Sequence, residues 1–470
     1  MTDLLVNDVH SGLNPTCVAR LLEPAGLEAL VETVKAAGAA GAHLSLCGGR
    51  HAMGGQQFGT DAWLIDMRRH SAIHAFDDER GIITVDAGIQ WPELIAACAA
   101  RQRLDRPAWG IRQKQTGADR MTLGGALSAN VHGRGLRFPP IVADVEAFTL
   151  IDPAGEVRRC SRDENPDLFR LAIGGYGLFG IIADVSLRLM PRVKLERRVE
   201  VLTLDELLRV PGARDTSQWM FGDFQYSIDE RSPDFLQRGV FSAYCRVDDD
   251  LPVPAGQMAL HSEDWRRLIY LAHTDRARGF QEYAGYYLGT HGQRYWSDTH
   301  QLGEYIEGYH EEIDRRLGAP RKGSEMITEL YVPRHALAEF MGQTAELLRA
   351  GGAPVIYGTI RLVERDDETF LAWAREPWAC VIFNLCVTHT PAGLAAAQEV
   401  FRRLIGIAIS HRGSYYLTYH RWATAAQVEA CHPRFREFLR LKQAHDPAEI
   451  FTSDWFRHHR DLFANDGARI

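Results

Sequence analysis

The stretch LCGGRHAMGGQQFGTDAWLIDM, residues 46–67, holds one histidine, His51, inside a loop that is rich in glycine. Glycine lets the backbone come close to a bound group, and successive N–H groups in such a loop make a concave site for anions. An imidazole beside that site is either an ordinary loop residue or a group that reacts. The loop over residues 47–55 therefore suits a pyrophosphate, although short glycine clusters also occur in plain tight turns.

Two further segments are rich in glycine. In GADRMTLGGALSANVHGRG, residues 117–135, Gly124 and Gly125 open a helical run of small residues, which is a second candidate anion site. The segment is not a P-loop, and it lacks the strand–GxGxxG–helix unit of a dinucleotide fingerprint. In IGGYGLFGII, residues 173–182, the glycines allow close approach to a flat ring or a phosphate. Each segment alone is equally compatible with a structural turn.

Composition narrows the class of protein. The chain has 470 residues, of which 46% are hydrophobic and 24% are charged, with a formal net charge of −8. This length predicts two or three domains, and the absence of a basic tract argues against a nucleic-acid partner. No signal-peptide pattern and no apolar run long enough for a membrane span is visible in the sequence. The eight cysteines are scattered singly, without CxxC or zinc spacing, so we expect a reduced, cytoplasmic protein with no metal.

The elements that must position these loops follow from local patterns. Helices are predicted over residues 27–41 and 91–103, and strands over 42–49, 62–67 and 81–88. Residues 143–160 predict a hairpin around the turn residues DPAG, and residues 165–191 predict a short helix, a glycine loop and a strand. After residue 195 the glycine loops thin out, and strands are expected over 327–333, 354–363 and 380–389, with a helix over 334–352. Helices close the chain.

Three glycine segments in this order and spacing resemble the FAD-binding domain of the vanillyl-alcohol-oxidase / p-cresol-methylhydroxylase (PCMH-type) superfamily. The similarity covers residues 15–193, in the pieces GGRHAMGG, GIITVDAGIQWPEL, TLGGALSANVHGRG, DPAGEVRRCS and DLFRLAIGGYGLFGII. The tail HPRFREFLRLKQAHDPAEIFTSD resembles the segment that returns to the flavin domain. Within the superfamily the chain is most similar to decaprenylphosphoryl-ribose oxidases, alditol oxidases and aldonolactone oxidoreductases.

The resemblance implies an α+β fold with three parts. They are a two-part FAD-binding PCMH-type domain over residues 1–194, a substrate or cap domain over 195–424 with an antiparallel sheet flanked by helices, and a returning segment over 425–470. It also implies FAD as cofactor, attached covalently to His51 through the flavin 8α-methyl, since an imidazole nitrogen is a competent nucleophile. Ribose-oxidase relatives lack this histidine and bind FAD without a covalent bond, so a hydrogen-bonding His51 is the alternative.

The same matching assigns the remaining cofactor residues. Those expected around the pyrophosphate and the flavin are Gly48, Gly49, Arg50, Ala52, Met53, Gly117, Thr122, Gly124, Gly125, Ser128, Asn130, Gly177 and Gly180. Ile182 is expected near the adenine, and the pair His132-Gly133 matches a His-Gly pair close to the flavin. A purely structural turn histidine is the alternative for His132.

Candidate substrate residues lie in the second half of the chain. Arg361 matches an arginine of alditol-oxidase-like members, but Thr359 replaces the acidic residue that stands two positions earlier, which puts a polyol site in doubt. Alternation places Tyr357 on the same strand face as Arg361. Asn384 and Cys386 match pocket-lining residues of the ribose-oxidase group. For Arg361 a surface ion pair, and for Cys386 plain packing, are the alternatives.

The sequence departs from its relatives at Tyr419, where ribose- and alditol-oxidase members carry a lysine near the flavin. Either Tyr419, if its pKa is depressed, or His420 could accept a proton in its place, and either could instead be a core or surface residue. The prediction is an FAD-dependent oxidoreductase that transfers a hydride from a CH–OH group of a small or medium-sized molecule to flavin N5. Reoxidation is by O2 or another acceptor. Amine (C–N) oxidation and oxidative ring closure are the enzymatic alternatives, and a fold that only binds a ligand is the non-enzymatic one.

Overall fold

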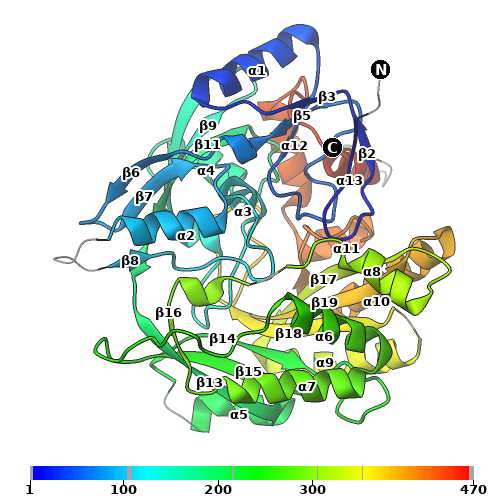
Figure 1. Ribbon diagram of the computed structural model, residues 1–470. Coiled ribbons are helices and arrows are strands. Elements are labelled where there is room, and N and C mark those ends of the chain that lie inside the picture. Colours follow the sequence, from blue (N-terminus) through cyan, green and yellow to red (C-terminus); the bar gives the residue numbers. More distant parts are fainter. Residues whose placement is uncertain (1–3, 103–107, 214–215, 304, 352, 465–470) are drawn as a thin grey trace.

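A computed structural model describes residues 4–102, 108–213, 216–303, 305–351 and 353–464. Its N-terminal elements form the upper part of the molecule in Figure 1, above a large sheet that the middle of the chain builds, and the C-terminal helices lie beside the N-terminal elements. This mixture of helices and sheets confirms the predicted α+β class. The expected domain boundaries at residues 194 and 424 stay a prediction.

A parallel sheet of β3 (Arg20–Leu22), β5 (Trp63–Asp66) and β4 (Leu44–Cys47) carries the first glycine loop, which leaves the end of β4. Helix α1 (Leu27–Ala40) joins β3 to β4 and buries Leu30, Val34 and Ala37, which lie on one helical face because they recur every three or four residues. It ends at Gly41, whose left-handed backbone (φ 62°) closes the last turn.

An antiparallel sheet supports the other two glycine segments, because the helix of the second, α3 (Leu123–Ala129), contacts β11 (Ile181–Arg188) and the third runs into that strand. Its strand order is β10-β9-β11-β7-β6, from β6 (Ile73–Asp77), β7 (Ile82–Asp86), β9 (Val145–Ile151), β10 (Val157–Ser161) and β11 (Ile181–Arg188). The predicted hairpin is β9–β10, and its turn is fixed by Asp152 Oδ1, which accepts the N–H groups of Ala154 and Glu156. Around the sheet lie α2 (Trp91–Ala100), α3 (Leu123–Ala129) and α4 (Pro166–Ala172). The last residue of the helix predicted over 91–103 lies outside the described residues.

The large sheet is antiparallel throughout and, within the described residues, has eight strands in the order β16-β13-β15-β14-β18-β19-β17-β20. The strands are β13 (Lys194–Thr203), β14 (Trp219–Tyr226), β15 (Arg238–Arg246), β16 (Arg294–Trp296), β17 (Gly323–Pro333), β18 (Val355–Val363), β19 (Trp378–Thr388) and β20 (Ser414–Tyr415). The three strands predicted in this region are β17, β18 and β19. The helices beside the sheet are α5 (Leu204–Ala213), α6 (Ser262–Thr274), α7 (Arg276–Gly289), α8 (Tyr309–Leu317), α9 (Leu337–Arg349) and α10 (Pro391–Ser410).

Short elements complete the chain. Two small ladders pair β1 (Leu4–Val6) with β2 (Thr16–Val18) and β8 (Trp109–Gly110) with β12 (Met190–Pro191). The 3-10 turns are η1 (Met67–Arg69), η2 (Ile141–Asp144), η3 (Thr299–Gln301) and η4 (Arg334–Ala336), and the last helices are α11 (Ala425–Cys431), α12 (Phe435–His445) and α13 (Asp454–Ala464). Residues 465–470, which the sequence predicts to be helical, lie outside the described residues.

The segment between α12 and α13 is bonded to the N-terminal parallel sheet. The Leu44 N–H donates to the Ile450 carbonyl (2.6 Å), and the Thr452 N–H donates to the Leu44 carbonyl (2.9 Å). The C-terminal segment therefore adds backbone hydrogen bonds to β4, the strand that presents His51.

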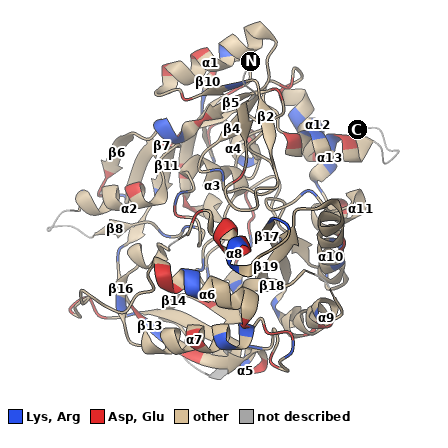
Figure 2. Cartoon of the chain, turned by 45° about the vertical axis from the view of Figure 1, so that its right-hand side comes forward, with Lys and Arg blue, Asp and Glu red and all other residues tan. Residues whose placement is uncertain are grey.

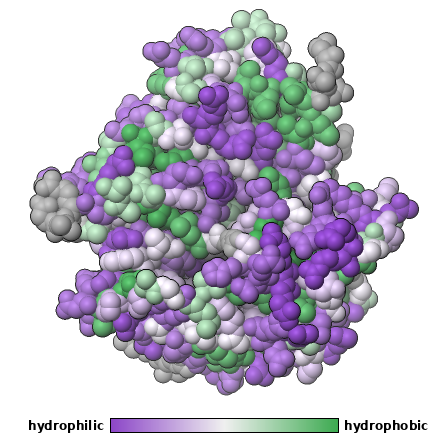
Figure 3. All heavy atoms as spheres, in the orientation of Figure 1, coloured by the Kyte–Doolittle hydropathy of each residue, from purple (hydrophilic) through white to green (hydrophobic). Residues whose placement is uncertain are grey.

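The surface of the described residues is mixed in charge and mostly hydrophilic. Lysine and arginine are interspersed with aspartate and glutamate along the chain (Figure 2), and hydrophobic residues form scattered patches on the face seen in Figure 3. No helix in the described ranges combines the length and the apolar character that crossing a bilayer requires.

The buried ion pair Lys442–Asp446 holds the C-terminal segment together, and both residues are almost fully buried. Asp446 also accepts the N–H groups of Ile450 and Phe451, each at 2.9 Å. Removing one partner of a buried pair leaves an uncompensated charge, so Asp446→Ala should lower the free energy of unfolding by about 3–5 kcal/mol. Urea unfolding followed by circular dichroism measures this loss. The control Asp461→Ala removes an exposed carboxylate beside Arg460 and should change stability by less than about 0.5 kcal/mol; equal effects would contradict the assignment.

Candidate active site

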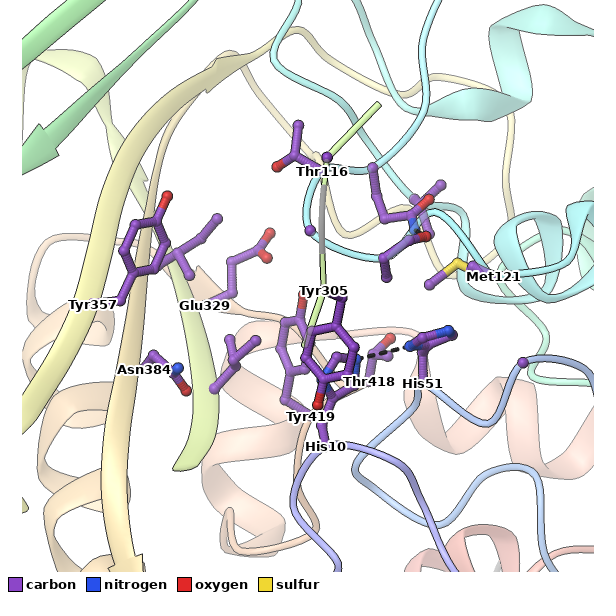
Figure 4. Close-up of a pocket in the computed structure, with 18 of the residues that line it drawn as sticks. His10, His51, Thr116, Met121, Tyr305, Glu329, Tyr357, Asn384, Thr418 and Tyr419 are labelled. Carbon is purple, nitrogen blue, oxygen red and sulfur yellow. Dashed lines mark hydrogen bonds between the residues drawn. The ribbon is translucent and has the colours of Figure 1, made fainter. Parts of the chain in front are cut away.

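A cavity of about 720 Å³ lies where the glycine loops of the N-terminal part face the large sheet. Figure 4 shows His51 with His10 on one wall and Glu329, Tyr357 and Asn384 toward the other. The volume falls in the range of cofactor and ligand sites.

Most of the predicted cofactor residues line this cavity. They are Gly48, Gly49, Arg50, His51, Ala52, Met53, Gly117, Thr122, Gly124, Gly125, Ser128, His132, Gly177, Gly180 and Ile182. Asn130 and Gly133 are not among the lining residues. Asn130 is buried with a left-handed backbone (φ 47°), and its side chain donates to Asp366 (2.9 Å). A Cβ on Gly133 would stand 2.8 Å from the Lys114 carbonyl, so this glycine serves packing.

The glycines of the first loop are needed mainly for loop–loop packing. A Cβ on Gly48 would stand 2.1 Å from Thr122 Oγ1, and one on Gly49 would stand 2.2 Å from the Arg120 carbonyl. The first and second glycine segments are thus pressed against each other along one side of the cavity. Thr122 also caps α3 by accepting the Gly125 N–H (3.3 Å). The close approach that the sequence suggested for a ligand is, at these two positions, an approach of protein to protein.

His51 is buried and oriented by a second histidine. Its Nδ1 lies 2.9 Å from His10 Nε2, and its Nε2 is buried without a partner among the described residues. His10 follows β1 and packs against the edge of the Tyr305 ring at 4.5 Å between ring centres. Burial lowers the pKa of His51 to about 4, so the ring is neutral near pH 7 and keeps a lone pair. The residues that orient His51 were missed in the sequence because no motif links His10 or Tyr305 to the glycine loop.

Glu329, on β17, is the centre of a hydrogen-bonded cluster in the cavity wall. Its Oε1 is 2.7 Å from His132 Nε2, and it accepts the Tyr331 hydroxyl at 2.5 Å and the Cys380 thiol at 3.3 Å. His132 Nδ1 lies 2.9 Å from the Gly133 carbonyl. Both ring nitrogens of His132 therefore face hydrogen-bond acceptors.

Electrostatics keeps Glu329 charged. Burial raises its pKa, but His132, Tyr331 and Arg361 together bring it below the usual value. Arg361, on β18, is buried, donates to Thr116 Oγ1 and has a partnerless Nε. The alternative of a surface ion pair for Arg361 is therefore wrong. The carboxylate that Thr359 does not supply comes from Glu329 on another strand; its only signal in the sequence was an acid inside the apolar run ITELYVP.

The two candidate bases at the C-terminal end differ in position. Tyr419 lines the cavity, but burial, with Glu329 nearby, raises its pKa well above the usual value, so the condition of a depressed pKa is not met. His420 is not among the lining residues. It stacks on Tyr415 and lies edge-on to Phe401, and burial lowers its pKa to about 3. The structure thus leaves Tyr419 as a hydroxyl donor at the cavity and His420 in the core.

Of the predicted substrate residues, Tyr357, Arg361 and Asn384 line the cavity, and Cys386 does not. The cysteine that reaches the site is Cys380, six residues earlier on β19, through its contact with Glu329. Alternation along β19 puts both cysteines and Asn384 at even spacing, so the periodicity alone could not choose between them.

Comparison with known proteins agrees with this geometry. Residues 18–161 match the family model described as FAD binding domain. The chain is 22% identical over 408 residues to an L-gulono-1,4-lactone dehydrogenase of Mycobacterium tuberculosis, which covers 85% of this chain and 86% of the relative. It is 31% identical to L-galactono-1,4-lactone dehydrogenase 1 of Oryza sativa subsp. japonica over 146 residues. This aligned stretch covers 31% of this chain and 24% of the relative. It is also 26% identical over 192 residues to L-gulonolactone oxidase of Bos taurus. These residues cover 41% of this chain and 42% of the relative.

These findings define the class. The chain carries a PCMH-type FAD-binding domain and is an FAD-dependent oxidoreductase of the kind that acts on CH–OH groups, as the sequence predicted. Its relatives reported above are aldonolactone dehydrogenases and oxidases, which is one of the three branches that the sequence resembles. The covalent bond at His51 and the individual site residues stay predictions.

The packing of Gly48 against Thr122 makes a prediction that needs no substrate. Gly48→Ala puts a methyl group into the Thr122 side chain, so the two loops must separate and the purified protein should lose most of its bound FAD. The ratio of visible flavin absorbance to protein absorbance measures this. Gly342→Ala, in α9 with open space at its Cβ, is the control and should retain FAD. Full FAD occupancy in Gly48→Ala would contradict the proposed packing.

Proposed function

We propose that this protein oxidises a CH–OH group of a polyhydroxylated lactone, or of a closely related small molecule, with FAD attached to His51. The observation that carries the reaction is the buried Glu329–His132 cluster with Arg361 on the cavity wall that faces the glycine loops. The names of the relatives supply the substrate class. When bound, FAD supplies a two-electron acceptor for the hydride and passes the electrons to O2 or another acceptor.

The Glu329–His132 pair handles the proton in this proposal. Oxidation of an alcohol to a carbonyl removes one hydride from carbon and one proton from oxygen, so a charged carboxylate at the cavity is a suitable acceptor for the hydroxyl proton. His132 and Tyr331 hold the carboxylate in one orientation through their hydrogen bonds. Tyr419 keeps its own proton because its pKa is raised, and it donates a hydrogen bond at the same wall.

Arg361 stabilises the negative charge that develops on the substrate oxygen as its proton leaves. Its guanidinium is buried, always protonated and held by Thr116. Charge stabilisation is stronger in a site that excludes water than at the surface, because the local dielectric is low. Thr116 immediately precedes the second glycine segment, so this contact couples the substrate-side arginine to the cofactor loops.

His51 is the attachment point in the proposal because it is neutral, buried and has one nitrogen without a partner. The imidazole would hold the flavin through a C–N bond from a ring nitrogen to the 8α-methyl carbon. Formation of this bond would remove one hydrogen from the carbon and one proton from the ring, with O2 as the two-electron oxidant and H2O2 as its product. Burial lowers the pKa of His10 to about 3, so His10 stays neutral and holds the His51 tautomer that exposes the reacting nitrogen.

The substrate class is tested by anaerobic mixing with L-gulono-1,4-lactone and L-galactono-1,4-lactone. Either lactone should bleach the visible flavin band, and Glu329→Gln should slow the bleaching about 10²- to 10⁴-fold with FAD retained. Glu346→Gln, an exposed acid on α9, is the control. If amines bleach the flavin and hydroxylated compounds do not, the result contradicts the proposal and favours C–N oxidation.

The attachment is tested by acid precipitation. The wild-type polypeptide should stay yellow and its mass should rise by one FAD, whereas His51→Ala should release all flavin. His10→Ala should slow attachment and give a mixture, since it removes the partner of His51 Nδ1. His335→Ala, an exposed histidine in η4, should behave as wild type. Complete release of flavin from the wild-type protein would leave His51 as a hydrogen-bonding residue.

A further inference from the structure

The part of the cavity formed by the large sheet holds a second polar group, away from Glu329. Asp223 and Gln225 come from β14, in the interior of the sheet between β15 and β18, and Tyr357 comes from β18. Asp223 is 5% exposed and Gln225 7% exposed. Burial removes water from the aspartate and glutamine side chains. This loss of hydration costs free energy unless hydrogen bonds within the site replace the lost water. We call this region, bounded by Asp223, Gln225, Tyr357 and Arg134, the tail lobe.

The protein does not itself satisfy these groups. The Gln225 amide nitrogen lies 3.4 Å from both Asp223 Oδ2 and the Tyr357 hydroxyl, which are long contacts. Asp223 Oδ1, Gln225 Oε1 and Arg134 Nε are buried and have no partner among the described residues. Buried polar atoms in native proteins are nearly always paired, so several unpaired ones lining one cavity indicate a bound polar partner.

The walls around these atoms are rigid. The Arg134 guanidinium lies over the Tyr244 ring at 4.8 Å and donates to the His300 carbonyl at 2.6 Å. Arg197 lies over Tyr287 at 4.5 Å and donates to Ser242. Neither arginine has a carboxylate within ion-pair distance in the part of the chain that the structure describes. The lobe is therefore held open by stacked side chains and not by an internal ion pair.

The tail lobe offers both hydrogen-bond donors and acceptors, and this combination restricts the chemical class of its ligand. A phosphate or carboxylate only accepts hydrogen bonds, and it would meet the Asp223 carboxylate and the Gln225 carbonyl oxygen without a donor to offer. An apolar tail would leave every one of these atoms unpaired. A hydroxyl group donates to Asp223 and accepts from Arg134 or Tyr357 at the same time. Neighbouring hydroxyl groups on a short carbon chain therefore match the lobe, and the other two chemistries do not.

We propose that the tail lobe binds the hydroxylated side chain of the substrate, with Asp223 as the specificity-determining acceptor. The inference rests on the proposed function, because it places the carbon that is oxidised at Glu329 and the side-chain hydroxyls at Asp223. Tyr357 and Arg361 both come from β18 and both line the cavity, so one strand connects the two ends of the substrate.

The test compares two lactones that share the hydroxylated ring. L-gulono-1,4-lactone carries a side chain with two hydroxyls, and erythrono-1,4-lactone has none. The ratio of their kcat/KM values for anaerobic flavin reduction measures recognition of the tail. Asp223→Ala should lower this ratio about 10- to 100-fold relative to wild type, since a hydrogen bond to a charged acceptor is lost only with the first lactone. An unchanged ratio, with both lactones slowed equally, would overturn the proposal.

Two controls distinguish a specific loss of side-chain recognition from a general loss of structure. Asp234→Ala removes a half-exposed carboxylate after β14 and should leave the ratio as in wild type, and FAD content and thermal stability report whether each variant folds. Should neither lactone reduce the wild-type flavin, the proposed function fails, and the lobe is then tested by binding. Sorbitol is titrated against the flavin spectrum. Weaker binding in Asp223→Ala than in wild type supports the lobe independently, and equal binding, or no binding by the wild-type protein, overturns it.

Discussion

A buried carboxylate, Glu329, links the large sheet to the glycine loops of this molecule. Glu329 stands on the large sheet, and its partner His132, 2.7 Å away, belongs to the second glycine segment of the FAD-binding domain. A charge this deeply buried is tolerated only when it is paired and hydrogen-bonded, and His132, Tyr331 and Cys380 provide those bonds. The same contact that places the sheet against the cofactor loops thus leaves a charged acceptor at the cavity.

Other polar contacts also connect parts of the chain around the cavity. Arg361 reaches from β18 to Thr116, the residue just before the second glycine segment, and the C-terminal segment is hydrogen-bonded to β4, the strand that leads to His51. Where the protein satisfies its buried groups, the contacts position loops and strands. Where it does not, as at His51 Nε2 and Asp223 Oδ1, the orphaned atoms face the cavity region that a cofactor and a substrate are proposed to fill. These two unpaired atoms are therefore the candidate contacts of the cofactor and of the substrate side chain.

Local pattern was enough to anticipate the N-terminal part. Helix α1 follows from its apolar spacing and Gly41, the β9–β10 hairpin from DPAG, and the glycine loops from their order along the chain. The substrate residues were harder to predict, because they are far apart in the sequence and only the folded sheet brings them together. Glu329 and Asp223 lie 106 positions apart on different strands, and apart from the apolar run around Glu329 nothing local distinguishes either from a solvated acid. The sequence predicts Cys386 at the site, but Cys380 contacts Glu329 instead, and His420 has the core position that was its alternative, because alternation fixes a face but not a depth. His10 approaches His51 from a loop between β1 and β2, which only the tertiary fold reveals.

The most direct test of this account is a crystal structure of the protein with FAD and a hydroxylated lactone bound. The account predicts FAD along the glycine loops with its isoalloxazine next to His51. The reacting hydroxyl should lie within hydrogen-bond distance of Glu329, and Arg361 should face the same oxygen. A lactone bound elsewhere in the cavity, with Glu329 contacting only His132, Tyr331 and Cys380, would contradict the assignment of Glu329 as proton acceptor and reduce the cluster to a structural link between the two halves.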